Sequence, residues 1–438
     1  MAKARAGIQP NRIFWRIFNK FPLRLRKITL KMIIEMRYLL FNIKWMMSHH
    51  NNTASPARVY WISTNRISEC LPTEIREKYF SAEGLRGKVV GGDWDITNCK
   101  FADYDCYDAF RKRFREGVEW QDTEYYKRLL REAESGDPLS PFRNETDVKK
   151  RFVFLEELYE SIKTEGYHLN RDNSTSAAQR NVSFGEIDVN IGRDGEYIFQ
   201  DGIHRLCIAK VLEIKYVPVM VFVRHKKWQE FREFVVYYAH HNICSKGQLY
   251  QPIVHPDFDD IPYEHGRGYF ELLEAISHHL GKKTGTMLDI GANLGFFSNK
   301  FEDLGYECYA VENDPATFQI LEKVKIAERK KFKTINNSIF EADVVRNMKF
   351  DVVLALNIFH HFLKTETQYK QLLELLKNLK TNELFFEPHD PHESQMKGAY
   401  ANFTESEFVD FLMQHLSLSN SEIIYHEKNG RNVYKLFK

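Results

Sequence analysis

The stretch that most constrains the fold of this chain is Met287–Ser298, which reads Met-Leu-Asp-Ile-Gly-Ala-Asn-Leu-Gly-Phe-Phe-Ser. Residues 286–290 predict a short buried strand, and Phe296 predicts the start of a helix. Gly291 and Gly295 lie between them, where a side chain would block a ligand. A strand that turns tightly into a helix presents free N–H groups and the positive end of the helix dipole. The spacing Asp-x-Gly-x-Asn-x-Gly differs from the Gly-x-Gly-x-x-Gly of dinucleotide enzymes.

A second feature is Glu312, which ends the apolar run 308–312 and follows Asp289 by 23 residues. A carboxylate at the end of the second strand is what a doubly wound fold uses to hold ribose hydroxyls. Three further apolar runs predict strands, and the segments between them have helical spacing. The predicted strands are 333–339, 350–357 and 384–388, and the predicted helices include 316–329 and 367–379.

The end of the chain predicts a hairpin. Residues 403–416 have helical spacing, and the apolar runs 422–426 and 432–437 are joined around Asn429-Gly430. Asn-Gly between two apolar runs is the strongest short hairpin signal. We therefore expect a parallel sheet that is finished by two antiparallel strands.

Through these motifs, residues 284–438 resemble the class I S-adenosylmethionine-dependent methyltransferases. The resemblance implies a Rossmann-like α/β sheet with a terminal antiparallel hairpin, and S-adenosyl-L-methionine as the cofactor. It implies that the first loop curls around the methionine end of the cofactor and that Glu312 holds the ribose. No acid follows the third strand, so adenine recognition would use a backbone amide or the Ser338 hydroxyl. The cofactor residues expected from the resemblance are Asp289, Gly291, Asn293, Gly295, Glu312, Asn313, Ser338 and Asn357.

In this family the loop after the fourth strand faces the transferred methyl group, and here it contains His360 and His361. Methyl transfer mainly requires positioning and exclusion of water, and a hydroxyl nucleophile also benefits from a base. We predict that one of these two histidines accepts a proton. The alternative is that His361 packs against the sheet. The next loop adds Glu387, His389, Asp390 and His392. The absence of an Asn-Pro-Pro-Tyr motif weighs against methylation of an amine in DNA.

The middle of the chain has a second ordered pattern. A strand at 59–63, a helix at 156–166, a hairpin around 193–195 and a strand at 217–223 frame the sequence Gln-Asp-Gly-Ile-His-Arg-Leu at 200–206. This order resembles the ParB/sulfiredoxin-like domain, an α+β fold. The resemblance implies that a nucleotide phosphate is bound by Asp201, Gly202, His204 and Arg205. Phosphate binding at this position is physically reasonable, because the Arg205 guanidinium can donate two hydrogen bonds to a phosphate and the start of a helix presents free backbone N–H groups. The alternative is that Asp201 caps the helix and Arg205 pairs with a surface acid.

We expect four parts in the chain: a basic amphipathic segment and linker at 1–55, the ParB/sulfiredoxin-like domain at 56–240, a helical connector at 241–283 and the methyltransferase at 284–438. Within the second part, Asp93 and Asp95 flank Trp94 after two glycines. They either hold a metal or act as a base, or they fix backbone amides in a turn, which is the commoner use. The histidine spacing matches no zinc pattern, so we expect no metal.

The composition limits the partners and the compartment. Six cysteines are scattered without a Cys-x-x-Cys pair, which favours a reducing, cytoplasmic compartment and argues against a disulfide or zinc framework. The net charge of +2 is close to neutral, so we consider nucleic acid an unlikely partner.

The first fifty residues are strongly basic, with eleven Lys or Arg against one acid, Glu35. Apolar residues between Ile28 and Met47 fall on one helical face. No apolar run approaches the roughly 20 residues that span a bilayer. The segment predicts either an interfacial helix at the inner membrane surface or a helix that packs on the next domain. A tether that binds nucleic acid is a third alternative.

These observations favour a methyltransferase for a small-molecule or glycan acceptor, with an appended nucleotide- or phosphate-binding domain. Two alternatives stay open. One is a bifunctional kinase-methyltransferase of a surface glycan, since relatives of the ParB/sulfiredoxin-like domain include a small-molecule kinase. The other is a ParB-like nucleotide- or DNA-binding protein with a regulatory methyltransferase-like domain.

Overall fold

The computed structural model of the protein describes residues 54–55, 57–80, 84–137, 140–169, 186–241, 247–264, 268–428 and 430–438. The chain forms two compact units, residues 1–233 and residues 234–438, and the boundary falls inside helix α8 (Lys226–His241). The predicted interfacial helix within residues 1–50 lies outside the described residues and stays a prediction. In the described ranges, no helix is long and apolar enough to cross a membrane.

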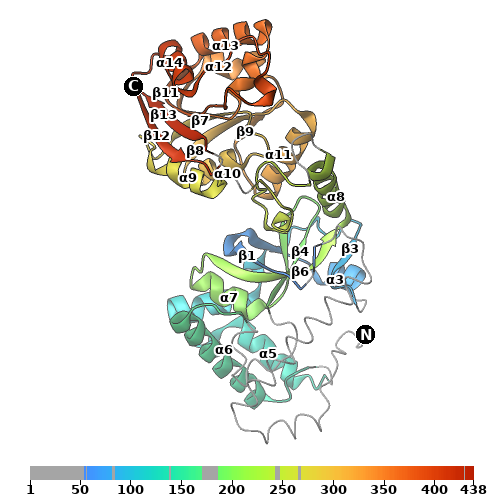
Figure 1. Ribbon diagram of the computed structural model, residues 1–438. Coiled ribbons are helices and arrows are strands. Elements are labelled where there is room, and N and C mark those ends of the chain that lie inside the picture. Colours follow the sequence, from blue (N-terminus) through green and yellow to red (C-terminus); the bar gives the residue numbers. More distant parts are fainter. Residues whose placement is uncertain are drawn as a thin grey trace, which may run out of the picture. The chain divides into compact units, whose positions relative to one another are not determined.

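The second unit is built on a seven-stranded sheet (Figure 1). Its strands are β7 (Gly285–Ile290), β8 (Tyr306–Val311), β9 (Lys333–Ile335), β10 (Lys349–Leu356), β11 (Lys380–Glu387), β12 (Asn420–His426) and β13 (Asn432–Phe437). The order across the sheet is β12-β13-β11-β10-β7-β8-β9. Strands β7 to β11 pair in parallel, whereas β13 pairs antiparallel with both β11 and β12. The predicted doubly wound sheet with a terminal hairpin is confirmed.

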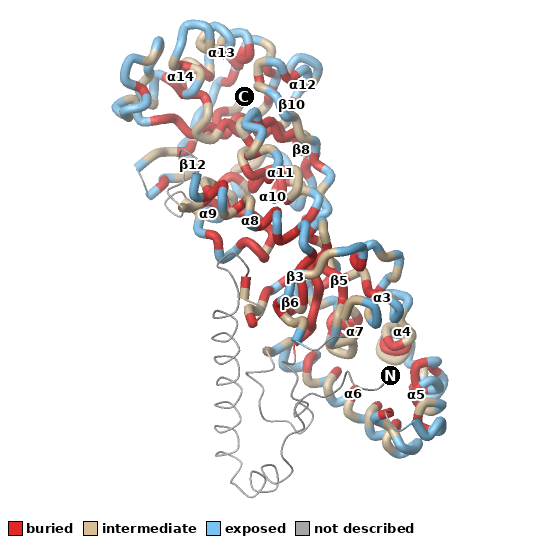
Figure 2. The backbone as a smooth tube through the Cα atoms, turned by 90° about the vertical axis from the view of Figure 1, so that its right-hand side faces the viewer, coloured by how far each residue is buried: buried red, intermediate tan, exposed pale blue. Residues whose placement is uncertain are grey.

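Helices cover both faces of this sheet, because successive residues of a buried strand point to opposite faces. Leu288 and Val353 belong to the apolar cluster on one face, and Met287 and Val352 belong to the cluster on the other. In Figure 2 the strands are among the most buried segments of the unit. The helices are α9 (Tyr269–His278), α10 (Phe296–Asp303), α11 (Pro315–Ala327), α12 (Asp343–Asn347), α13 (Glu366–Asn378) and α14 (Glu405–Leu416), with short 3-10 turns η6 (Pro256–Phe258), η8 (Ile339–Glu341), η9 (Phe359–Leu363) and η10 (Ser394–Met396).

The third strand of this sheet is shorter than predicted. It ends at Ile335, because the chain turns where Asn337 Oδ1 accepts a hydrogen bond from the backbone N–H of Ser338 at 2.8 Å. Ser338 then caps the turn η8 through its hydroxyl oxygen, which accepts from the N–H of Phe340. Asn and Ser side chains compete with strand pairing in this way.

The first unit contains a six-stranded mixed sheet. Its strands are β1 (Val59–Ser63), β2 (Ile67–Cys70), β3 (Lys88–Val90), β4 (Ile187–Ile191), β5 (Tyr197–Asp201) and β6 (Tyr216–His225). The order is β1-β6-β4-β5-β2, and β3 pairs with β6 in addition. Strands β4 and β5 form the predicted antiparallel hairpin.

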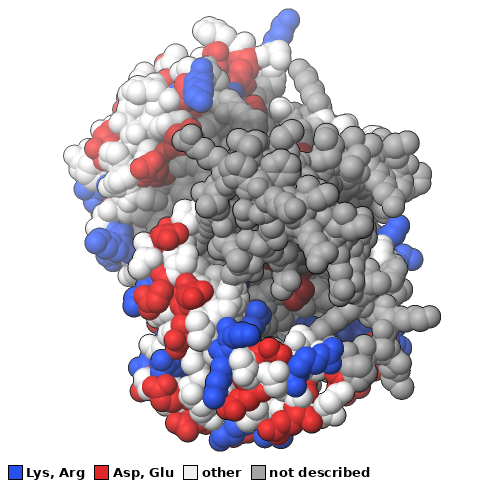
Figure 3. All heavy atoms as spheres, turned by 90° about the horizontal axis from the view of Figure 1, so that it is seen from below, with Lys and Arg blue, Asp and Glu red and all other residues white. Residues whose placement is uncertain are grey.

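The helices of the first unit are α3 (Thr73–Phe80), α4 (Asp105–Arg111), α5 (Glu124–Glu134), α6 (Glu145–Glu165) and α7 (Ile203–Val211), with short turns η1 (Thr64–Arg66), η2 (Phe101–Asp103), η3 (Lys112–Glu116) and η4 (Trp120–Asp122). Gly166 ends α6 as predicted. Basic and acidic side chains alternate over the described surface that Figure 3 displays, which shows no single-sign patch for a polyanion.

The expectation that the chain lacks a disulfide is wrong. Cys70, at the end of β2, is bonded to Cys99, which lies 29 residues further along. The backbone N–H of Cys70 donates to the carbonyl oxygen of Cys99 at 3.1 Å, so local strand-like pairing brings the two residues together. Sequence spacing without a Cys-x-x-Cys motif carries no information about such pairing.

Candidate active site

The loop after β7 requires glycine for reasons of packing inside the protein. Gly291 and Gly295 have φ angles of +71° and +79°, which L side chains rarely adopt. A Cβ on Gly291 would lie 2.9 Å from Cδ1 of Ile358, and a Cβ on Gly295 would lie 3.1 Å from Cγ of Leu321. The N–H groups of Gly291 and Ala292 both donate to the carbonyl oxygen of Val311, which ties this loop to the end of β8.

Two asparagines lie at the carboxyl edge of the sheet in the left-handed conformation. Asn293, in the loop after β7, has φ of +51°, and Asn357, after β10, has φ of +55°. The side-chain oxygens of both are buried and accept no hydrogen bond from any residue that the structure describes. Positive φ angles outside glycine and unsatisfied buried polar atoms are both costly and concentrate at functional sites. A ligand with hydrogen-bond donors would satisfy both oxygens.

Glu312 lies beside this loop. Its Oε2 accepts from the N–H of Asn293 at 2.9 Å, and its Oε1 accepts from the N–H of Asp314 at 2.8 Å. Burial raises the pKa of its carboxyl above the usual range. Each carboxylate oxygen has a second lone pair, so both oxygens can still accept from the hydroxyls of a ligand.

The other predicted cofactor residues occupy the same edge in different ways. Asp289 is buried at the end of β7, accepts a hydrogen bond from the Ser298 hydroxyl at 2.7 Å, and has its pKa raised to about 6 by burial. Ser338 is half-buried and caps η8, whereas Asn313 is exposed. Asp289 therefore connects the end of β7 to helix α10 through its hydrogen bond with Ser298.

A segment that precedes the sheet in sequence, residues 247–264, packs on this loop, a contact that was not predicted. It lies within the predicted helical connector 241–283, but its helical structure is limited to the turn η6. The Tyr250 hydroxyl accepts from Nδ2 of Asn357 at 3.0 Å, and Oε1 of Gln251 accepts from the N–H of Phe296 at 3.4 Å, at the start of α10. Leu249 fixes the segment through its N–H, which donates to the carbonyl oxygen of Pro262 at 2.7 Å. The segment has little regular structure, so it lacks the periodicity that sequence analysis detects.

The two histidines after β10 differ in environment. His360 is 2% exposed, and neither of its ring nitrogens has a hydrogen-bond partner among the described residues. Burial, together with His361, His389 and two nearby cations, lowers its pKa to about 2. His361 is exposed, and its Nδ1 lies 3.2 Å from Nζ of Lys364. The structure thus buries His360 and leaves His361 at the surface, so His361 does not pack against the sheet.

The loop after β11 adds a second buried imidazole. Nε2 of His389 lies 2.8 Å from Oδ1 of Asn402, and its ring centroid lies 5.7 Å from that of His360. Asp390 and His392 are exposed, and the Asp390 carboxylate accepts from the N–H of His392 within its own turn. Of the four residues named in this loop, His389 and Glu387 are buried and the other two are not.

Sequence analysis missed Arg431, which belongs to the hairpin between β12 and β13. Its guanidinium pairs with Glu387 at 3.2 Å and with Glu393. These ion pairs connect the hairpin to Glu387 at the end of β11 and to Glu393 in the following loop, and they fix the positions of both carboxylates. Only the topology brings this residue, 44 positions after Glu387, to the site.

In the first unit, the predicted phosphate-binding residues lie at the junction of β5 and α7. The side chains of His204 and Arg205 contact other groups of the protein there. Gly202 caps α7 with φ of +89°, and its N–H bonds Asp201 Oδ1 at 2.7 Å. Nη1 of Arg205 lies 3.8 Å from the buried carboxylate of Glu186. Both ring nitrogens of His204 are engaged within the protein: Nε2 lies 2.7 Å from the Tyr125 hydroxyl, and Nδ1 lies 3.0 Å from Nη2 of Arg151.

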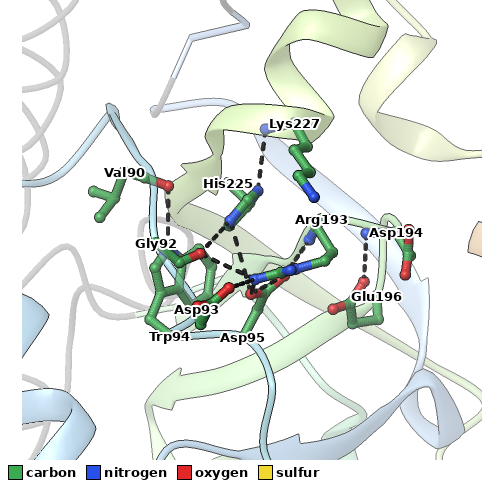
Figure 4. A network of polar contacts seen from close by, with 10 residues as sticks. All are labelled: Val90, Gly92, Asp93, Trp94, Asp95, Arg193, Asp194, Glu196, His225 and Lys227. Atoms are coloured by element: carbon green, nitrogen blue, oxygen red, sulfur yellow. Dashed lines mark hydrogen bonds and ion pairs between the residues drawn. The ribbon is translucent and has the colours of Figure 1, made fainter.

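Asp93 and Asp95 belong to a network that joins β3 to the β4–β5 hairpin (Figure 4). The buried Asp95 accepts from the backbone N–H and the guanidinium of Arg193. His225 bonds the carbonyl oxygen of Gly92 at 2.8 Å through Nε2 and accepts from the N–H of Lys227 through Nδ1. These contacts correspond to the backbone-fixing alternative. No group of three or more His, Cys, Asp or Glu is placed to hold a metal ion in the part of the chain that is described.

The comparisons with known proteins agree with the topology of the second unit. Residues 288–386 match the methyltransferase domain family. The strand order and the glycine loop of the second unit agree with this match. No curated protein matches the sequence.

Several solved structures are similar to part of the chain. WbdD, described as a bifunctional kinase-methyltransferase, matches with 18% identity over 43% of this chain and 44% of its own, with a TM-score of 0.36. Magnesium protoporphyrin IX methyltransferase (ChlM) from Synechocystis PCC 6803 matches with 13% identity over 39% of this chain and 80% of its own, with a TM-score of 0.31. The N-methyltransferase NodS from Bradyrhizobium japonicum WM9 matches with 12% identity over 39% of this chain and 96% of its own, with a TM-score of 0.31. The chain thus spans less than half the length of WbdD.

Proposed function

We propose that the second unit is an S-adenosylmethionine-dependent methyltransferase that acts on a small-molecule or glycan acceptor. The observation that carries the proposal is the pair of buried, unsatisfied amide oxygens of Asn293 and Asn357 at the carboxyl edge of the sheet, where Glu312 bonds the backbone of Asn293. Three acceptor groups at one edge of the sheet suit a ligand rich in hydrogen-bond donors. S-adenosylmethionine has such donors in its ammonium group and its two ribose hydroxyls.

The residues fit this cofactor in a simple division of roles. Glu312 would accept hydrogen bonds from the ribose hydroxyls, while Asn293 and Asn357 would accept from the ammonium group. The glycine turn leaves the backbone close to the ligand, and the start of α10 suits the carboxylate of the methionine part. When bound, the cofactor supplies an electrophilic methyl group on a sulfonium. The protein's part is to position the acceptor and to exclude water.

Thermal-shift titration with S-adenosylmethionine tests this proposal. The wild type should be stabilised, because a ligand that binds only the folded state raises its melting temperature. Glu312→Gln should weaken binding by about 1.5–3 kcal/mol, the range for a hydrogen bond to a charged group. Glu307→Gln is the matched control, since Glu307 lies on β8, the strand that Glu312 follows, and its side chain is 54% exposed. Equal responses of the two variants, or no response of the wild type, would count against the proposal.

For the first unit we propose a ParB/sulfiredoxin-like domain that binds a nucleotide or another phosphate. Support comes from Gly202 at the start of α7 and from Arg205 beside it. Because His204 is bonded within the protein, the proposal rests on Arg205 and the helix amides. Arg205→Ala should abolish a thermal shift produced by a nucleotide panel, and Arg131→Ala, an exposed arginine of α5, should retain it. If the wild type responds to no nucleotide or sugar phosphate, the proposal fails.

A further inference from the structure

A chain of two hydrogen bonds determines which ring nitrogen of a neutral His389 carries the hydrogen. Nδ2 of Asn402 donates to the carbonyl oxygen of Pro391 at 2.9 Å, which turns Oδ1 of Asn402 toward Nε2 of His389 at 2.8 Å. An amide oxygen only accepts, so Nε2 carries a hydrogen, and in the neutral form of the ring Nδ1 then has the lone pair. That Nδ1 is buried and bonds none of the residues that the structure describes.

The ring of His360 lies next to that of His389 and adds a hydrogen-bond donor and a further acceptor. Its ring is neutral, because burial holds its pKa at about 2, and a neutral imidazole has one N–H donor and one lone pair. Its two nitrogens are also buried and bond no described residue. Together the two rings offer two lone pairs and one N–H, at the ends of the adjacent parallel strands β10 and β11. Ligands of doubly wound sheets bind at this edge.

These groups discriminate between classes of acceptor. A hydroxyl donates one hydrogen bond and accepts two, so it can satisfy a lone pair of one ring and the N–H of the other. An ionised phosphate or carboxylate only accepts, so it would leave the lone pairs unsatisfied against a negative charge. Of the two nearby cations, Arg431 is paired with Glu387 and Glu393, whereas Nζ of Lys364 lies beside the exposed His361 and donates to Oε1 of Gln395 at 3.2 Å.

We propose that His360 and His389 form the acceptor subsite for an uncharged, hydroxyl-bearing molecule, such as an alcohol or a sugar, and that His389 Nδ1 is the proton acceptor. This inference rests on the proposed methyltransferase function. The hydroxyl oxygen forms a bond to the methyl carbon as the carbon–sulfur bond breaks, and the sulfur keeps the electron pair. The hydroxyl proton passes to Nδ1 of His389 and then to water. Because the rings of His360 and His389 are both buried, the residues that pack over them have to move when the acceptor binds.

Nitrogen NMR of the full chain labelled with ¹⁵N-histidine tests the first step without any ligand. His389 and His360 are assigned from the variants His389→Gln and His360→Gln. His389 should show a neutral ring protonated at Nε2, and Asn402→Leu should give a mixture of the two tautomers while Asn402→Asp retains the Nε2–H form. A wild-type ring protonated at Nδ1 would overturn the proposal, and this result is independent of cofactor binding.

The second step uses the same protein with S-adenosylhomocysteine and compares methyl glucoside and glycerol with inorganic phosphate. The hydroxyl probes should shift the His389 Nδ1 signal and phosphate should not. Methyl transfer from S-adenosylmethionine to the better probe should fall at least tenfold in Asn402→Leu, and Asn402→Asp should retain the activity with an altered pH profile. A shift caused by phosphate alone, or by none of the probes, would overturn the acceptor class. Failure of S-adenosylhomocysteine to bind would instead contradict the proposed function.

Discussion

The side-chain nitrogen of Asn357 lies 3.0 Å from the hydroxyl oxygen of Tyr250, although the two residues are 107 positions apart. Asn357 directly follows the parallel strand β10 and has a left-handed conformation, and Tyr250 belongs to the irregular segment 247–264. Tyr250 is itself anchored, because the Tyr269 hydroxyl donates to its carbonyl oxygen. The bond therefore connects the segment 247–264 to the loop after β10. It also fixes the orientation of the Asn357 amide, whose oxygen is unsatisfied.

Removing this bond should loosen the candidate cofactor site. Tyr250→Phe deletes only the hydroxyl, so we expect a loss of about 0.5–1.5 kcal/mol in the free energy of unfolding. We also expect weaker binding of S-adenosylmethionine, since Asn357 loses the partner of its amide nitrogen. Urea unfolding and calorimetry measure the two effects. Tyr400→Phe, at a residue that is 54% exposed, is the control, and equal behaviour of both variants would contradict the role of Tyr250.

Gly291 should tolerate no side chain, for two separable reasons. Gly291→Ala adds the cost of a left-handed L-residue, about 1–2 kcal/mol, and a contact with Ile358 at 2.9 Å. Gly398→Ala is a matched control, because Gly398 has φ of +79° but nothing within 4 Å of the added carbon. The difference in unfolding free energy between the two variants measures the contact. The double variant with Ile358→Val should recover part of that difference, and no recovery would contradict the packing explanation.

The buried neutral ring of His360 should make the protein sensitive to acid. Its pKa is about 2 in the folded state and about 6.5 when unfolded, so the unfolded state binds more protons between these values. The neutral ring costs no stability above pH 6.5, and the free energy of unfolding falls as the pH is lowered, by about 3 kcal/mol at pH 4.5. His360→Gln should flatten this dependence in urea unfolding series, whereas His278→Gln, at an exposed position, should not. Parallel pH curves for wild type and His360→Gln would disprove the assignment.

The disulfide between Cys70 and Cys99 should stabilise the first unit. Closing a loop of this length stabilises by about 3–4 kcal/mol in the chain-entropy account. Reductant should therefore lower the melting temperature of the wild type and leave the double variant Cys70→Ser/Cys99→Ser unchanged. Alkylation followed by mass spectrometry should find both sulfurs protected before reduction. Two free thiols in the purified protein would contradict the pairing.

Local patterns were enough to predict the sheet of the second unit. The glycine loop, the acid after β8 and the terminal hairpin each depend on residues close together in sequence, and all three are where they were predicted. Likewise, the helix that ends at Gly166 and the β4–β5 hairpin follow from capping and turn residues.

The parts that could not be predicted depend on contacts between distant residues. Arg431 reaches Glu387, and Tyr250 reaches Asn357, only because the fold brings separate segments to one edge of the sheet. The same applies to Cys99 and to the inward orientation of His204 toward Tyr125. Such side chains have no periodicity or motif of their own, so a single sequence does not reveal their partners.

Isothermal titration calorimetry of the full chain with S-adenosylmethionine tests the central claim most directly. The wild type should bind one equivalent, and Asn293→Leu should bind at least tenfold more weakly, because it removes one of the unsatisfied oxygens. Asn378→Leu, at a half-buried asparagine that ends α13 and whose side chain bonds Glu374 of the same helix, should bind like the wild type. Absence of heat with the wild type, or equal affinity in Asn293→Leu, would contradict the assignment of this edge of the sheet as a cofactor site.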